Sequence, residues 1–437
     1  MGYALEKSKA HWCERAAGSI SIIKLYNSLV NNYKASNYAL NSQLKSNFGF
    51  DPFPKSCTLR AMAKLILSDG TVFEGQSFGA TVDTDGEVVF NTGMVGYPES
   101  LTDPSYQGQI LVFTYPLIGN YGVPSMEKNE FGFSKNFESE AVQVRGVVVA
   151  QVSDEYSHFS AASSLQNFLE HFGIPGITGV DTRALTKKLR EHGVMLGRIV
   201  QGVGGRESGG GEIADPNLNN LVAEVSCSEV ITYEPKTKNE TPISIVAYDC
   251  GIKRNIIRSW LKRGVTVHRV PWNYDLAKNP SNLKYDGVFV SNGPGDPKMC
   301  RETIAAMKWS IEQNIPTFGI CLGNQLMALA IGGDTYKLKY GHRGANQPCV
   351  EAGSSHCIIT SQNHGFAVDE KTLPSGWSVW WRNANDGTVE GIRHESGRFF
   401  AVQFHPEATP GPEDANYLFD TFLGVLEQEK VLVEGKK

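Results

Sequence analysis

The residue best placed to do chemistry in this chain is Cys321, in the stretch FGICLGNQLMALAIGG. It stands between Gly319 and Gly323, after a short apolar run and before a run with a helical pattern. Small neighbours let a chain turn sharply, and a helix that begins behind a cysteine favours its thiolate through the helix dipole and free N–H groups. The spacing therefore predicts a nucleophile at a strand–turn–helix corner. The motif alone leaves open a buried cysteine that glycines merely flank.

A second pair of reactive side chains follows the strand-like run FFAVQF near the C-terminus. His405 and Glu407 flank Pro406 at the end of this run. Residues two apart on an extended segment point to the same side, so the imidazole and the carboxylate are expected together. A carboxylate bonded to one ring nitrogen fixes the tautomer and stabilises the imidazolium. Alone, the pair is typical of a solvated turn, but together with Cys321 it predicts a Cys-His-Glu triad.

Two polar stretches could complete such a site. The glycine-rich SNGPGDP, residues 291–297, can bring backbone N–H groups close to a carbonyl, and it lacks the pattern of a phosphate-binding loop. The stretch SQNHGFAVD, residues 361–369, offers polar groups beside Phe366. An ordinary hairpin turn explains this second stretch equally well.

The elements that must position these residues alternate between strands and helices after residue 242. Apolar strand patterns at 243–249, 265–272 and 316–320, and another within 285–297, are separated by helical patterns. Strands without polar alternation, joined by helices, predict an open, mostly parallel sheet with helices on both faces. Active sites of such sheets lie beyond the carboxyl ends of the strands, where Cys321 falls.

The preceding region has a mixed α and β pattern. Residues 63–79 read as two strands joined by an Asp69–Gly70 turn, and Asp181 and Gly193 bracket a helix. The glycine-rich 202–216 indicates a mobile surface loop. The polar, proline-bounded 234–242 is typical of an inter-domain linker. We therefore expect an α/β protein with an extension at 1–62, a mixed α/β domain at 63–225, a linker at 226–242 and a parallel-sheet domain at 243–430.

Composition narrows the class of protein. The 437 residues are 41% hydrophobic and carry a formal net charge of -5, without a long basic stripe or a bilayer-length apolar run. Nucleic-acid binding and a membrane location are therefore not expected. The eight cysteines form neither a C-x-x-C pair nor a short framework, which favours a reducing compartment over structural zinc or disulfides.

Residues 1–62 differ in composition, with eight Lys or Arg against three acids. That balance suits an organelle transit peptide or a plain solvated extension, and we favour the extension. A cytoplasmic location is therefore expected, and a mitochondrial or plastid one if these residues are a transit peptide.

The motifs G-I-C-L-G, Q-F-H-P-E, S-N-G-P-G-D-P and S-Q-N-H-G-F together resemble the triad-type (class I) glutamine amidotransferases. The N-terminal stretches LILSDGTVFEGQSFGA, VVFNTGMVGYPESLTDPSYQGQILVFTYPLIGNYGV and GIPGITGVDTRALTKKLREHG resemble the small, glutamine-hydrolysing subunit or domain of carbamoyl-phosphate synthetase. The animal-type fused pyrimidine-pathway form is the most similar. The resemblance covers roughly residues 63–427 and leaves 1–62 outside.

This resemblance implies roles for individual residues. Cys321 is the nucleophile, His405 the base and acid, and Glu407 the residue that orients His405. Gly295 and Leu322 supply backbone oxyanion donors. The implied contacts with glutamine are Ser105, Gly293, Gly295, Leu322, Gln325, Asn363, Gly365 and Phe366.

The same resemblance implies a partner. Ammonia released from glutamine passes to a synthetase large subunit or fused domain, which makes carbamoyl phosphate from bicarbonate and ATP for the pyrimidine or arginine pathway. ATP, Mg and bicarbonate belong to that partner, and this chain is expected to hold no cofactor and no metal. The N-terminal domain is expected to dock onto the synthetase and help to enclose the ammonia path.

One position departs from the resemblance, because Asn324 stands where the family usually has histidine. Urea-cycle relatives that have lost the cysteine also carry asparagine there. Since Cys321, His405 and Glu407 are all present, we expect activity to survive.

Three other functions fit part of the sequence. An amidotransferase of another synthase would share the triad motifs but not NTGMVGYPESLTDPSY. A non-catalytic docking subunit would tolerate Cys321→Ser. A free-standing cysteine hydrolase would cleave peptides and ignore glutamine analogues.

Overall fold

The computed structural model describes residues 60–202, 211–237 and 241–434. The predicted extension lies outside the described residues up to position 59, as does the 203–210 part of the predicted mobile loop. Strands of the described chain form a closed barrel, one ten-stranded sheet and two small two-stranded sheets.

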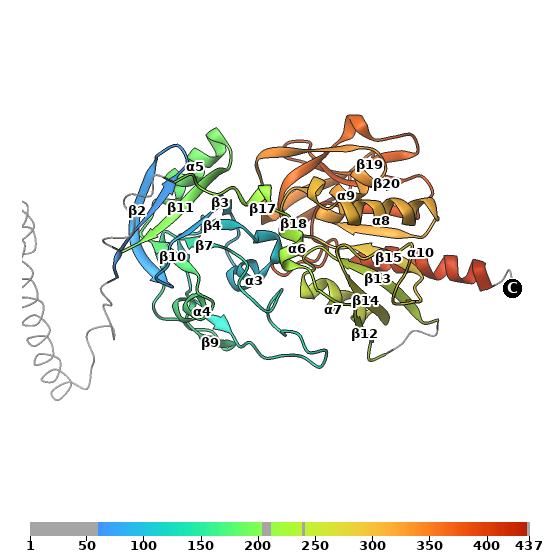
Figure 1. The fold of residues 1–437 in the computed structure, drawn as a ribbon, viewed down its shortest axis with the longest axis horizontal. Helices are drawn as coiled ribbons and strands as arrows, with labels where there is room; N and C mark the ends of the chain where they lie inside the picture. Colours follow the sequence, from blue (N-terminus) through green and yellow to red (C-terminus); the bar gives the residue numbers. More distant parts are fainter. Residues whose placement is uncertain (1–59, 203–210, 238–240, 435–437) are drawn as a thin grey trace, which may run out of the picture. The chain divides into compact units, whose positions relative to one another are not determined.

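The first half of the described chain is the closed barrel, with strand order β1-β11-β3-β4-β7-β10-β2. The mixed α and β character was predicted, but the closure of the sheet was not. The barrel strands are β1 (Met62–Leu67), β2 (Val72–Gly79), β3 (Thr84–Asn91), β4 (Gln109–Phe113), β7 (Gly146–Val148), β10 (Pro175–Thr178) and β11 (Met195–Gln201) (Figure 1).

Short elements connect these strands. The pairs β5–β8 and β6–β9 form the two small sheets. The connecting elements are α3 (Tyr97–Thr102), η1 (Pro104–Tyr106), β5 (Leu117–Ile118), β6 (Val123–Pro124), β8 (Gln151–Val152), β9 (Ala161–Ser163), α4 (Leu165–His171), α5 (Thr182–His192), η2 (Pro216–Leu218) and α6 (Leu221–Val225).

Alternating side chains of the barrel strands enter two separate apolar clusters. On β4, Ile110 packs in the cluster that includes Leu185 of α5, whereas Leu111 packs with Phe168 of α4. This period of two is what a strand buried on both faces requires.

Two local predictions for this half are confirmed. Strands β1 and β2 pair as an antiparallel hairpin around Asp69 and Gly70. The Asp181 side chain accepts a hydrogen bond from the Ala184 N–H at the start of α5, and Gly193 ends that helix.

The second half is the ten-stranded sheet, with order β12-β14-β13-β15-β16-β21-β20-β19-β17-β18. Its strands are β12 (Ile231–Tyr233), β13 (Ile243–Asp249), β14 (Val265–Pro271), β15 (Gly287–Val290), β16 (Thr317–Ile320), β17 (Asp334–Glu351), β18 (Cys357–Asp369), β19 (Trp377–Asn383), β20 (Val389–His394) and β21 (Phe399–Val402). Its helical elements are α7 (Arg254–Lys262), η3 (Pro297–Met299), α8 (Arg301–Glu312), α9 (Leu322–Ala330), η4 (Glu370–Thr372) and α10 (Tyr417–Glu434).

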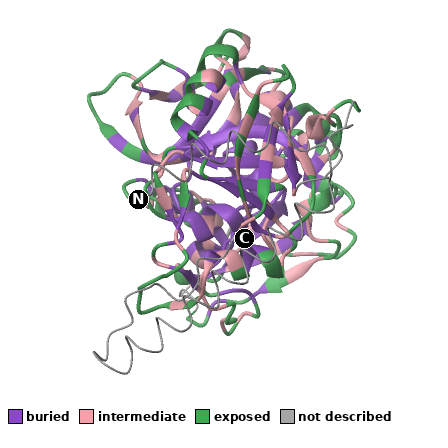
Figure 2. Cartoon of the chain, turned by 90° about the vertical axis from the view of Figure 1, so that its left-hand side faces the viewer, coloured by how far each residue is buried: buried purple, intermediate pink, exposed green. Residues whose placement is uncertain are grey.

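Helices cover both faces of this sheet, as predicted. On β13, Ile245 packs in the cluster of α7 and α10, whereas Val246 packs in the cluster of α8 and α9. Figure 2 shows the buried residues gathered along the strands and the exposed residues mainly in the peripheral loops and helix faces.

The sheet combines a parallel and an antiparallel part. Strands β14, β13, β15, β16 and β21 run parallel, and β20, β19, β17 and β18 continue the sheet in antiparallel pairs. Antiparallel neighbours need only short turns, so no helix separates them in the sequence. The alternation of strands and helices therefore revealed only the parallel part.

The structure corrects the predicted linker at 226–242. Residues Ile231–Tyr233 form β12, which pairs antiparallel with β14, and Tyr233 packs in the core cluster of α7 and α10. A three-residue strand gives too short an apolar pattern to be recognised in a polar segment. Among the helices of the described residues, none combines the length and apolar character needed to cross a bilayer.

Candidate active site

Cys321 lies at the corner between β16 and α9, as predicted. Its backbone has φ 55° and ψ -100°, which is a strained conformation for a residue with a side chain. Its N–H donates to the Val402 carbonyl of the neighbouring β21 at 2.8 Å. A Cβ at Gly319 would lie 2.6 Å from the Gly323 carbonyl oxygen, and one at Gly323 would lie 2.3 Å from the Val290 oxygen. Both glycines are therefore required for the close approach of the backbone around the thiol.

Backbone N–H groups gather next to the thiol. Leu322 is the first residue of α9, and the N–H groups of a first helical turn have no partner within their helix. The stretch 291–297 follows β15, and the Gly323 N–H donates to its Ser291 carbonyl at 3.1 Å. The loop that carries Gly293 and Gly295 is therefore held against the start of α9.

His405 and Glu407 are buried side by side beyond the end of β21. The His405 Nδ1 lies 2.6 Å from the Glu407 Oε1, so the two-residue spacing brings the side chains together as predicted. The His405 Nε2 is buried without a hydrogen-bond partner among the described residues. It is the ring nitrogen left to exchange a proton with a reacting group.

Opposite charges set the protonation of this pair. Burial lowers the pKa of His405, but the charges of Glu407 and Cys321 outweigh it and raise that pKa to about 10. Burial raises the pKa of Glu407, but Lys253 and His405 lower it to about 2. At neutral pH the histidine is therefore an imidazolium beside Cys321, and the glutamate is a carboxylate.

Lys253 is a part of this arrangement that the sequence patterns did not reveal. It precedes α7, and its buried Nζ lies 2.9 Å from the Glu407 Oε1 and donates to the Ala408 carbonyl at 2.6 Å. The sequence did carry a hint of this role, because Lys253 closely follows the apolar strand β13. A lysine that is buried there needs a partner that compensates its charge. No pattern in the sequence names that partner.

Asp103 and Ser105 of the barrel half form hydrogen bonds with residues of the site. Asn363 on β18 accepts a weak hydrogen bond from the Cys321 Sγ to its carbonyl at 3.6 Å, and its Nδ2 donates to the Asp103 Oδ2 at 3.1 Å. Asp103 also accepts the Ser105 N–H at 2.9 Å. The Ser105 Oγ in turn accepts a hydrogen bond from the Asn292 Nδ2 at 2.9 Å. One buried carboxylate therefore fixes two of the residues expected to contact glutamine.

The stretch 361–369 is part of a strand and not a hairpin turn. It forms most of β18, which pairs antiparallel with β17. Its polar residues and glycine resemble a loop in the sequence, because the side chains line a site instead of a core.

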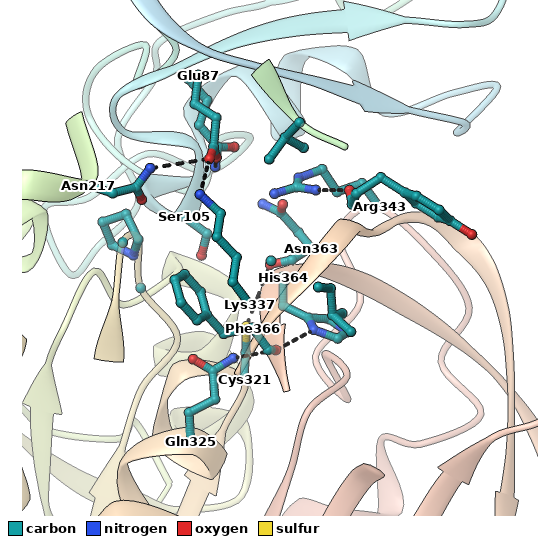
Figure 3. Close-up of a pocket in the computed structure, with 18 residues that line it drawn as sticks. Glu87, Ser105, Asn217, Cys321, Gln325, Lys337, Arg343, Asn363, His364 and Phe366 are labelled. Atoms are coloured by element: carbon teal, nitrogen blue, oxygen red, sulfur yellow. Dashed lines mark hydrogen bonds and ion pairs between the residues drawn. The ribbon is translucent and has the colours of Figure 1, made fainter. Parts of the chain in front are cut away.

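A pocket opens in front of the thiol (Figure 3). It brings together most of the residues that the sequence singled out. The predicted residues that line it are Ser105, Gly293, Gly295, Cys321, Gln325, Asn363, Gly365 and Phe366. Leu322, His405 and Glu407 are not in its lining; His405 lines a neighbouring pocket, which also includes Asn363, Asp103 and Lys253.

The pocket also contains charged residues that sequence reasoning missed. Glu87 of β3 is buried and forms an ion pair with Lys337 of β17 at 2.6 Å, and Asn217 donates to the same carboxylate oxygen at 3.2 Å. Arg343 of β17 lies beside Asn363 (Figure 3). Each is a single polar residue in a strand or connection, with no partner at a recognisable spacing.

Asn324 is not among the residues that line the pocket, and its side chain belongs to a small amide network. Its Nδ2 donates to the Gln403 Oε1 at 3.1 Å, and the Gln325 Nε2 lies 3.3 Å from the same oxygen. Gln325 also donates to the Phe366 carbonyl at 3.0 Å. The Asn324 side chain therefore supports neighbouring amide groups, whereas its backbone N–H donates to the Cys321 carbonyl at 3.1 Å.

A cluster of His342, His364 and Glu390 is the arrangement in the described residues that could hold a metal ion, with ligand atoms within 4.8 Å of one another. Each ring nitrogen already lies within 3.2 Å of a protein oxygen. The His342 nitrogens face Glu390 and Asp386, and the His364 nitrogens face the Phe366 carbonyl and Gln362. The cluster is therefore hydrogen-bonded without an ion.

Comparison with known proteins identifies the family. Residues 246–425 match the class-I glutamine amidotransferases, and residues 65–199 match the carbamoyl-phosphate synthase small chain, CPSase domain. The carbamoyl phosphate synthase arginine-specific small chain of Chaetomium globosum is 49% identical over 362 residues, which cover 83% of this chain and 77% of that protein. The chain belongs to the carbamoyl-phosphate synthase small-chain family.

Other relatives include a further small chain and a much longer multifunctional protein. The arginine-specific small chain of Aspergillus oryzae is 48% identical over 84% of this chain and 81% of its own length. The multifunctional protein CAD of Squalus acanthias is 52% identical over 364 residues, but this chain spans only 16% of that protein's length. The solved structure of a putative GMP synthase component from Thermoplasma acidophilum aligns over 45% of this chain and 100% of its own, at 22% identity and a TM-score of 0.39.

Proposed function

We propose that this chain hydrolyses glutamine to glutamate and ammonia through Cys321, His405 and Glu407. The observation that carries the proposal is the strained Cys321 at the start of α9, beside a buried imidazole that Glu407 orients at 2.6 Å. Membership of the small-chain family, with its amidotransferase region, supports the same reaction.

In the first step Cys321 attacks the side-chain amide carbon of glutamine. The imidazolium form of His405, favoured by its raised pKa, stabilises the thiolate beside it. The oxygen that gains the electron pair faces the backbone N–H groups of Leu322 and Gly295, in the manner of an oxyanion hole. The carbon–nitrogen bond then breaks, His405 gives its proton to the departing ammonia, and a glutamyl thioester remains on Cys321.

In the second step water hydrolyses the thioester. His405, now neutral, takes a proton from the attacking water and returns it to the sulfur as glutamate leaves. Glu407 keeps Nδ1 protonated throughout, so that Nε2 is the nitrogen that exchanges protons. The chain needs no cofactor of its own for either step.

We propose that the ammonia passes to a carbamoyl-phosphate synthetase large subunit or fused domain. That partner uses ATP and bicarbonate to make carbamoyl phosphate for pyrimidine or arginine synthesis. We also propose a cytoplasmic location. The six cysteines of the described chain are free thiols, which suits a reducing compartment.

The experiment is to measure glutamate release from glutamine, with and without a synthetase large subunit, ATP and bicarbonate. The proposal predicts glutamate release that the partner stimulates, together with carbamoyl phosphate. Absence of glutamate under both conditions would overturn the glutaminase role. Glutamate release without any response to the partner would overturn the coupling.

A further inference from the structure

A second cavity lies at one end of the barrel and shares no lining residue with the pocket in front of Cys321. Two of its lining residues, Thr92 and Thr114, directly follow β3 and β4. Two others, Ala150 and Val180, lie two residues beyond β7 and β10. These four strands pair in parallel, so their carboxyl ends meet at this cavity. Ligands of proteins with parallel sheets or barrels typically bind beyond such strand ends.

The first residues of helix α5 form part of the lining. The chain passes from β10 through Gly179 into this 11-residue helix, and Asp181, Thr182 and Arg183 all line the cavity. The Arg183 N–H has no hydrogen-bond partner among the described residues. Free N–H groups and the helix dipole favour an anion at this end of a helix. Asp181 is the acidic residue of the lining, and its carboxylate is engaged in capping the helix through the Ala184 N–H.

The cavity side of α5 is positively charged. Arg183, Lys187 and Arg190 line the cavity with the spacing i, i+4 and i+7, which places them on one face of the helix. In the described chain none of the three forms an ion pair with a carboxylate. Lys188, which is not in the lining, pairs instead with Asp69 at 2.5 Å. The three cations are therefore free to bind an anion.

A buried hydroxyl in the lining also lacks a partner. The hydroxyls of Thr92, Thr114 and Thr186 each donate to a backbone carbonyl. The hydroxyl of Thr182 has no hydrogen-bond partner among the described residues, although Thr182 is only 4% exposed. A buried hydroxyl without a partner costs free energy, which a ligand that accepts its hydrogen bond would recover.

We propose that this cavity binds a small molecule that carries a chain of phosphate groups. Phosphate oxygens accept hydrogen bonds, and the cations, the helix N-terminus and the free hydroxyl all supply donors. Arg183 and Arg190 are seven residues apart, about 10 Å along the helix axis. A single phosphate or carboxylate is shorter than that distance, so two or three linked phosphates fit the three cations better. The site is separate from the triad, and the proposed glutamine hydrolysis does not require it.

The test is isothermal titration calorimetry of the full chain with tripolyphosphate, pyrophosphate and inorganic phosphate. The variants are Lys187→Gln, which removes one lining charge, and Thr182→Val, which removes the free hydroxyl and keeps the shape of the side chain. Lys188→Gln is the matched control, because it makes the same charge change on the same helix outside the lining. The far-ultraviolet circular dichroism of each variant shows whether it is folded.

We expect tripolyphosphate to bind more tightly than pyrophosphate, and inorganic phosphate to bind most weakly. Lys187→Gln should weaken tripolyphosphate binding by about 10-fold and Thr182→Val by about 5-fold, whereas Lys188→Gln should resemble wild type. No binding of tripolyphosphate at millimolar concentration would overturn the proposal. Equal losses in Lys187→Gln and Lys188→Gln, with wild-type affinity in Thr182→Val, would also overturn it, because they would show a general attraction of anions to α5.

Discussion

The Nζ of Lys253 lies 2.9 Å from the Glu407 Oε1, the same oxygen that lies 2.6 Å from the His405 Nδ1. The carboxylate is therefore held from two sides, by a cation before α7 and by the imidazole that it orients. All three side chains are buried. The triad consequently depends on a residue more than a hundred positions earlier in the chain, between β13 and α7.

Replacing Lys253 by methionine should destabilise the fold and slow glutamine hydrolysis. The change leaves the Glu407 charge buried with one partner fewer, which typically lowers the free energy of unfolding by about 3–5 kcal/mol. Urea unfolding and glutamate release measure the two effects. The matched control is Lys262→Met, on the exposed face of α7, which should resemble wild type. A Lys253→Met chain as stable and active as wild type would contradict this role.

Stability should depend on pH through His405 and Glu407. The folded pKa of His405, about 10, exceeds its unfolded value of 6.5, so its contribution is complete below pH 6.5 and is lost as pH rises toward 10. The folded pKa of Glu407, about 2, lies below its unfolded value of 4.5, so its contribution is complete above pH 4.5 and is lost as pH falls toward 2. Both contributions are present between pH 4.5 and 6.5.

The measurement is urea unfolding of wild type and His405→Asn from pH 6 to pH 9. The excess stability of wild type should fall with rising pH, by at most about 1.4 kcal/mol per pH unit. A difference that stays constant over this range would show that His405 does not carry a raised pKa.

Replacing Asp103 by asparagine should weaken glutamine binding more than catalysis. Asp103 accepts hydrogen bonds from the Asn363 side chain and the Ser105 backbone, and both residues line the pocket. Loss of a charged acceptor is worth about 1.5–3 kcal/mol, so the KM for glutamine should rise by about 10- to 100-fold.

Steady-state kinetics of glutamate release measure this effect. The control is Asp369→Asn, because Asp369 caps η4 with the same local geometry away from the pocket. An unchanged KM in Asp103→Asn, or an equal effect in both variants, would contradict a specific positioning role.

Chelation of divalent ions should leave glutamate release by the chain alone unchanged. The cluster of His342, His364 and Glu390 is hydrogen-bonded on every ring nitrogen, so an ion is not needed to satisfy it. Activity is compared before and after dialysis against EDTA, with metal content measured in parallel. One bound zinc per chain, together with loss of activity on its removal, would contradict this expectation.

The sequence predicted the parts of the site that depend on local geometry. The corner at Cys321 was recognisable because close backbone contacts leave no room for a side chain at Gly319 and Gly323. The pairing of His405 with Glu407 followed from a spacing of two in an extended segment. The sheet domain was recognisable from the alternation of apolar strands and helices.

Contacts between distant segments could not be predicted in this way. Asn363 and Asp103 are 260 positions apart, and neither the Lys253–Glu407 pair nor the isolated Arg343 follows any periodicity. Closure of the barrel depends on pairing of β1 with β11, whose registers are set by packing and not by a turn. Polar residues on β18 looked like a loop because they face a pocket.

The most direct test of the proposed reaction is to identify the residue that carries the glutamyl group. The chain is mixed with glutamine, quenched in acid and mapped by peptide mass, in wild type, Cys321→Ser and His405→Asn. We expect a glutamyl thioester on the peptide that contains Cys321, its absence in Cys321→Ser, and much slower formation in His405→Asn. Continued glutamate release by Cys321→Ser, or a glutamyl group on another cysteine, would contradict it.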